Sequence, residues 1–163
     1  MNHSIKVGFS FGLTSAVITT LGLMMGLYAS TESKLVVISG VLLIATADAL
    51  SDALGIHLSE EAENKHTKKE IWQSTFSTLI FKFLFASVFV VPLIILELQA
   101  AVIANIILGF LMLGIFSYSI ASEQNVNKLE VVLEHFAVAI IVLILTYLIG
   151  HYINSWVEGK PNI

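Results

Sequence analysis

The stretch LVVISGVLLIATADALSDALGIHLSEEAE, residues 35–63, decides the class of this protein. It is apolar and long enough for a membrane-spanning helix, yet it carries Asp48 and Asp52 and ends in an acidic cluster. Because the two aspartates are four residues apart, they share one face of a helix. Continuing that face adds Gly55, Ser59 and Glu63. We therefore predict a polar stripe on an apolar helix that leads to an acidic mouth and forms a path for a cation.

The composition of the whole chain supports the membrane assignment. Hydrophobic residues make up 56% of the chain and charged residues only 12%, whereas a soluble domain has about a quarter charged residues. Mean hydropathy is +0.89. The chain has no cysteine, which excludes disulfides and thiolate metal sites. Its basic residues are all lysines without a basic face, which argues against nucleic-acid binding.

Five apolar segments predict an all-α integral membrane protein with one transmembrane domain over residues 1–163. The first segment lacks a cleavage-like ending, so we expect it to remain as a helix. Thr67 and Glu70 form a capping-box pattern before the third segment. The expected spans are residues 7–29, 35–58, 71–96, 101–121 and 131–153.

The distribution of lysines predicts the orientation. If the amino terminus is inside, the outer segments hold only Lys34 and Lys160, while Lys82 lies within a span. Five lysines then lie inside: Lys6, Lys65, Lys68, Lys69 and Lys128. This asymmetry favours an internal amino terminus and an external carboxyl terminus. Because no targeting feature is present in the sequence, we expect a prokaryotic plasma membrane.

Glycines in the first span predict close helix packing. Gly8 with Gly12, and Gly22 with Gly26, each form a pair of small residues four apart. Such pairs let helix backbones approach closely in lipid. A five-helix chain with such a face is expected to form a homodimer.

The second span would be marginal in lipid on its own. Two central aspartates cost roughly 5–7 kcal/mol on the insertion scale, and the ten Val, Ile and Leu residues between Val37 and Leu58 return only roughly 3–6 kcal/mol. The polar stripe must therefore face protein, water or a bound ion.

Two carboxylates in a low dielectric predict coupling between a metal ion and protons. Without a cation, at least one carboxylate is expected to hold a proton, and a divalent cation would expel it. Oxygen ligands suit Fe²⁺ or Mn²⁺ as the transported ion, with no prosthetic group. Met24 and Met25 are candidates for additional thioether ligands, although packing is the commoner role of methionine.

Lys82 adds a positive charge at a similar depth to Asp48, about 15 Å from the helix end at the helical rise. One interpretation is a counter-charge that pairs with Asp48 or Asp52 until a metal ion or proton competes. A second is a lysine that snorkels to the inner surface. A third is a permanent internal salt bridge in a protein that transports nothing.

A charged segment follows the second span and predicts a cytosolic mouth that attracts cations. His57 is off the acidic stripe, and we expect it near the membrane surface. The mouth residues are Glu60, Glu61, His66 and Glu70, joined by Glu134 and His135 at the start of the fifth span.

Several motifs resemble those of the vacuolar iron transporter family. They are residues 8–15 (GFSFGLTS), 91–94 (VPLI), 147–150 (YLIG) and, most specifically, 47–63 (ADALSDALGIHLSEEAE). The resemblance covers nearly the whole chain. It implies a five-helix dimer that exports Fe²⁺ or Mn²⁺ from the cytosol in exchange for protons, with an ion path between the subunits lined by the first two helices.

The chain also departs from that family. Phe11 stands where the family has an acidic residue, and Asp52 stands where it has methionine, while Asp48 matches a family acid. Residues 59–70 are too few for the family's cytosolic metal-binding insert. Three functions stay open: a divalent-metal transporter, a related protein with a different ion or a proton pathway, and a non-transporting scaffold. An enzyme is not expected, because the sequence lacks a catalytic triad, a phosphate loop and a closed histidine set.

Overall fold

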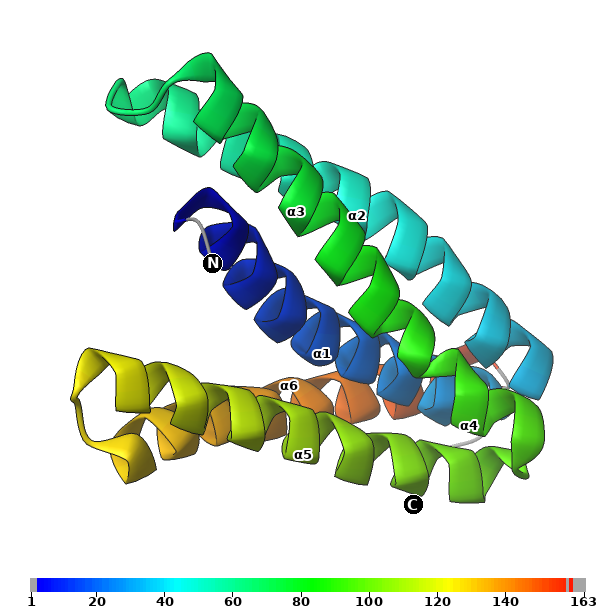
Figure 1. The fold of residues 1–163 in the computed structure, drawn as a ribbon. Helices are drawn as coiled ribbons and strands as arrows, with labels where there is room; N and C mark the ends of the chain where they lie inside the picture. The colour runs from blue at the N-terminus through cyan, green and yellow to red at the C-terminus, as the bar shows by residue number, and fades with distance from the viewer. Residues whose placement is uncertain (1–2, 158, 160–163) are drawn as a thin grey trace.

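The computed structural model describes residues 3–157 and 159, and within them the protein is a bundle of helices without strands (Figure 1). The helices are α1 (His3–Thr31), α2 (Lys34–Glu63), α3 (Lys68–Val88), α4 (Val90–Ile95), α5 (Leu98–Gln124) and α6 (Lys128–Val157). With α3 and α4 taken together, five helical segments are long and apolar enough to cross a membrane. The protein is therefore an all-α, multi-pass membrane protein.

The helices extend past the predicted spans because capping groups lie beyond the apolar cores. Ser33 accepts a hydrogen bond from the backbone N–H of Val36 at the start of α2. Thr67 and Glu70 form the predicted capping box of α3. Asn64 and Asn125 adopt the left-handed conformation where α2 and α5 end. The predicted boundaries therefore mark the apolar parts of longer helices.

The third predicted span, residues 71–96, is not one helix, because it breaks at Phe89 between α3 and α4. Pro92 has no N–H to donate to the carbonyl of Val88 one turn earlier. Next to this gap, the side-chain amide of Asn105 on α5 donates a hydrogen bond of 2.9 Å to the Phe89 carbonyl. A neighbouring helix thus satisfies a backbone group at the break.

Helix α1 lies at the centre of the bundle (Figure 1). It packs against α2 and α3 on one side and against α5 and α6 on the other. Helices α2 and α3 form one hairpin, and α5 and α6 form another. The two hairpins open away from each other at the end that carries residues 64–67 and 125–127, with the start of α1 between them (Figure 1).

The glycines of α1 pack within the chain. A Cβ on Gly8 would lie 2.5 Å from the backbone nitrogen of Thr78, and one on Gly12 would lie 3.0 Å from that of Lys82, so both face α3. A Cβ on Gly22 would lie 2.6 Å from Val142 of α6. Because these small-residue pairs contact helices of the same chain, they give no support to the predicted homodimer.

Helix α6 has the least buried surface. Among its residues only Ala139 and Gly150 are buried, whereas ten residues of α1 are. In a membrane, most of α6 and the outer face of α2 must therefore contact lipid or another protein.

Candidate cation site

Lys82 lies at the centre of a charged cluster between α1, α2 and α3. The residue is only 1% exposed. Its Nζ lies 2.6 Å from Oδ2 of Asp48, pairs with Oδ2 of Asp52, and donates a hydrogen bond of 2.8 Å to Oγ of Ser15. Lys82 therefore does not snorkel to the surface. Of the three interpretations above, the snorkelling lysine is wrong, and the two that pair Lys82 with the aspartates stay open.

The two aspartates are held differently. Asp52 accepts hydrogen bonds from Lys82 and, at 2.7 Å, from the hydroxyl of Ser15. Oδ2 of Asp48 is close to the same ammonium but is not aligned with it as a hydrogen bond. Asp52 is thus the more firmly fixed of the two, and Asp48 is the one that can change partners at lower cost.

Small side chains let the three helices approach closely enough for this cluster. Ala16, Ala45 and Ala86 pack together, one from each of α1, α2 and α3. Each lies within one turn of Ser15, Asp48 or Lys82 in sequence. Because alanine has only a methyl group, the backbones come near enough for short aspartate side chains to reach Lys82.

The cluster has unequal charges and one accessible side. With all three groups ionised, two carboxylates and one ammonium leave a net charge of minus one. The side chains of Asp48 and Asp52 are 26% and 22% exposed, while that of Lys82 is 1% exposed. Part of each aspartate side chain is therefore accessible from outside the bundle, although Oδ2 of Asp48, which faces Lys82, is itself buried.

The rest of the predicted stripe does not join this cluster. Gly55, Ser59 and Glu63 are exposed on α2. Oε2 of Glu63 lies 3.9 Å from Nε2 of His66 and 4.0 Å from Nζ of Lys65. The stripe is thus divided into a buried charged part and a separate acidic end.

Met24 and Met25 are not placed beside the aspartates, contrary to their assignment as candidate ligands. Met24 is fully buried, and its Sδ lies 3.3 Å from Nδ2 of Asn105. Met25 packs against the same hydrophobic core. Met24 is nine residues beyond Ser15 on α1, roughly 13 Å along the helix. Both methionines therefore serve in packing.

The predicted mouth is not one cluster. Glu61 is exposed, and Glu70 accepts a hydrogen bond of 2.8 Å from the backbone N–H of Thr67. The ring of His66 stacks on that of His3. Glu134 and His135 lie on α6, in the other hairpin, where Nδ1 of His135 is 2.7 Å from the carbonyl of Val131.

Two further predictions about side chains can be compared with the structure. His57 is half-buried, with Nδ1 2.9 Å from Oγ1 of Thr75 and its ring against Trp72. Glu60 is buried, at 7% exposed, so its predicted place in an exposed cytosolic mouth is wrong. In the described part of the chain, no three His, Asp or Glu side chains are grouped so that they could hold a metal ion.

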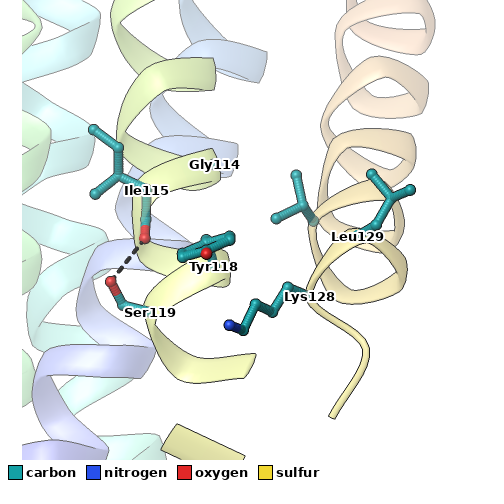
Figure 2. A pocket seen from close by; sticks show the side chains of 7 residues that line it. Gly114, Ile115, Tyr118, Ser119, Lys128 and Leu129 are labelled. Carbon is teal, nitrogen blue, oxygen red and sulfur yellow. Dashed lines mark hydrogen bonds between the residues drawn. The ribbon is translucent and has the colours of Figure 1, made fainter. Parts of the chain in front are cut away.

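A hollow of about 590 Å³ lies elsewhere, between α5 and α6. Figure 2 shows Lys128 reaching across it toward Tyr118, with the ammonium 5.1 Å from the ring centroid. Its lining is mostly apolar and carries no carboxylate. This groove is therefore not the candidate site, which is identified by its charges and not by its volume.

Ser15 and a row of hydroxyls on α3 were not among the predicted site residues. Ser15 lies at the end of the residue 8–15 motif, but a serine in an apolar helix usually bonds to its own backbone. The row was visible as Ser74-Thr75-Phe76-Ser77-Thr78 within an apolar segment.

No protein-family model matches this chain, and no curated protein is significantly similar to it. The resemblance to vacuolar iron transporters therefore rests on the motifs alone.

Proposed function

We propose that this protein is a secondary transporter that exchanges a cation for protons at Asp48 and Asp52. The observation that carries the proposal is the buried ion cluster, in which Lys82 holds two carboxylates that are each about a quarter exposed. Ionisable groups within membrane helices are expensive and usually have a function. A cation that reaches the exposed side competes with the ammonium for the same two carboxylates.

The charge of the cluster supports competition rather than a fixed bridge. The net charge of minus one is favourable for one additional positive species. Asp48 is the natural entry point, because it is held through its ion pair with Lys82, whereas Asp52 is also held by Ser15. Asp52 keeps Ser15 as a second partner when the ammonium moves.

Fe²⁺ or Mn²⁺ is the substrate that the family resemblance favours, exported from the cytosol in exchange for protons. Carboxylate oxygens are suitable ligands for both ions. With an internal amino terminus, the end that carries residues 64–67 faces the cytosol. A homodimer that meets along the exposed face of α2 would bring a second pair of aspartates near the first.

A second candidate function is a pathway for protons alone or for a monovalent cation. The arithmetic of charge favours it, because one positive charge neutralises the cluster while Lys82 stays in place. A divalent ion would leave an excess positive charge unless the ammonium moves away.

Flux into proteoliposomes tests these functions. The protein is reconstituted with a pH-sensitive dye inside, and Mn²⁺, Fe²⁺, Na⁺ or K⁺ is added outside. Metal uptake with counter-moving protons supports the proposal, whereas proton movement without metal dependence supports the second candidate. Absence of any flux from protein that is folded in the vesicles would support a non-transporting scaffold.

A further inference from the structure

A row of buried polar side chains runs along α3 toward the charged cluster. Ser74, Thr78 and Lys82 are spaced four residues apart, so they lie on one face of the helix. None of the three is more than 1% exposed. The row continues beyond Lys82 as Ala86, which is also buried but apolar. The polar part of the face therefore lies only on the side of Lys82 toward residues 64–67.

The hydroxyls of this row differ from their neighbours. Thr75 donates to the carbonyl of Ile71 at 2.7 Å, and Ser77 donates to that of Gln73 at 2.6 Å, as hydroxyls in apolar helices commonly do. The hydroxyls of Ser74 and Thr78 have no hydrogen-bond partner among the described residues. A buried hydroxyl without a partner costs about 1–3 kcal/mol, so two in succession require an explanation.

Glu60 lies on α2 at about the level where this row begins. It is 7% exposed, and its Oε2 has no hydrogen-bond partner in the described part of the protein. The antiparallel contacts Asp52–Lys82 and His57–Thr75 set the register of α2 against α3. Three residues beyond His57, this register brings Glu60 level with the first turns of α3, where Ser74 lies.

Helix α1 closes the third side. The hydroxyl of Ser77 lies 3.3 Å from the carbonyl of Ser4, and Gly8 packs on the backbone at Thr78. Eight residues separate Glu60 from Asp52, which is roughly 12 Å along α2. Between the α2–α3 turn and the Lys82 cluster there are thus three unpartnered oxygens, from Glu60, Ser74 and Thr78.

We propose that Glu60, Ser74 and Thr78 line a narrow hydrated inlet that connects the α2–α3 end of the protein to the Lys82–Asp52 pair. Its ligands are water and the small cations or protons that water carries. Water can bridge buried polar groups and supply the hydrogen bonds that the protein does not. The carboxylate of Glu60 gives the inlet a preference for positive species.

Other charged groups at this end do not replace Glu60. Lys6 pairs with Glu123 of α5, and Glu70 caps α3 through Thr67. His3 stacks on His66, and His57 contacts Thr75. Among the described groups named at this end, Glu60 is the buried carboxylate with an oxygen that lacks a partner.

The inlet rests on the proposed function, because access is useful only if the cluster exchanges ions, but it can be tested without transport. The chain has no cysteine, so single cysteines can be introduced without background. Thr78→Cys and Ser74→Cys change little in volume. Each variant in sealed vesicles is treated from either side with a membrane-impermeant, cationic methanethiosulfonate reagent, which reacts with a hydrated thiolate.

Three control positions calibrate the reaction. Lys65→Cys, in the exposed α2–α3 turn, identifies the side of the membrane that carries this turn. Ala86→Cys is equally buried on the same face of α3 but lies beyond Lys82. Ile80→Cys is on the exposed surface of α3, which faces lipid, where a thiol does not ionise. We expect Thr78→Cys and Ser74→Cys to react only from the side of Lys65→Cys, and roughly tenfold or more faster than Ala86→Cys.

A second measurement assigns the role of Glu60. Adding Glu60→Gln to Thr78→Cys should slow the cationic reagent roughly three- to tenfold and leave an anionic reagent unaffected or faster. If Thr78→Cys and Ser74→Cys react no faster than Ala86→Cys in protein that elutes as a single folded species, the inlet does not exist. If they react as expected but no ion flux is found, the inlet stands and the transport function falls. Flux without labelling overturns the inlet alone.

Discussion

Nζ of Lys82 lies 2.6 Å from Oδ2 of Asp48, and the Lys82 side chain is only 1% exposed. Because this ammonium is shielded from bulk solvent, its carboxylate partners determine whether the three-helix core is stable. The same contacts determine how a cation could enter, because any competing ion must bind the oxygens that Lys82 now holds.

Lys82→Met should destabilise the protein and make it dependent on cations. Removal of one partner from a buried ion pair typically costs about 3–5 kcal/mol, because the other charges are left uncompensated. A cation that binds only the folded state then restores stability by mass action. We expect the thermal midpoint in detergent to fall, and Mn²⁺ to raise it more in the variant than in the parent.

Lys65→Met is the matched control for that change, because Lys65 is exposed and its ion pair with Glu63 is long, at 4.0 Å. Its midpoint should stay unchanged. Equal responses of the parent and Lys82→Met to Mn²⁺ would show that the metal ion does not use the position of the ammonium.

Asp52→Asn should cost more stability than Asp48→Asn. Asp52 accepts hydrogen bonds from both Ser15 and Lys82, whereas Asp48 has only the ion pair. We expect a loss of about 2–4 kcal/mol for Asp52→Asn and about 1 kcal/mol or less for Asp48→Asn. Chemical denaturation in mixed micelles measures both, and the reverse order would contradict the assigned contacts.

Gly8→Ala should force α1 away from α3, whereas Gly26→Ala should be tolerated. A Cβ on Gly8 would lie 2.5 Å from the backbone nitrogen of Thr78, and backbone cannot move aside easily. A Cβ on Gly26 would meet its nearest neighbour at an ordinary 3.5 Å. The expected cost is about 1–3 kcal/mol for Gly8→Ala and within about 0.5 kcal/mol for Gly26→Ala, measured by thermal unfolding. Similar midpoints for the two variants would refute the close contact.

Met24→Leu should leave both stability and cation flux nearly unchanged, because Met24 packs in the core away from the aspartates. Swaps of similar volume usually cost less than about 1.5 kcal/mol. Asn105→Leu is the informative comparison. It removes the donor to the Phe89 carbonyl at the α3–α4 break, and we expect a loss of about 0.6–1.7 kcal/mol. A strong loss of flux in Met24→Leu would return this residue to the ion path.

The membrane class and the five spans could be predicted because length and apolar composition nearly determine them. The break at Phe89 could not, although Pro92 was visible, because the apolar run continues through it and only the contact with Asn105 shows how the gap is filled. The helix ends were underestimated for the opposite reason, because caps such as Thr67 lie in polar sequence outside the spans.

The candidate site was predictable in part. Equal depth in two neighbouring spans was enough to pair Lys82 with the aspartates in two of the three interpretations. Ser15 could not be derived, because its partner depends on how α1 is rotated against α2. The prediction of a single cytosolic mouth failed for a similar reason. The sequence places Glu134 and His135 at the start of the last span, but it does not show that the two hairpins diverge at that end.

The position of α1 has a mechanical consequence. Gly8 and Gly12 face α3, whereas Gly22 faces α6, so the two hairpins hold opposite parts of a single rod. Ser15 lies between these two contacts. Any tilt of one hairpin against the other would therefore pivot about α1, and Lys82 with its aspartates lies close to that pivot.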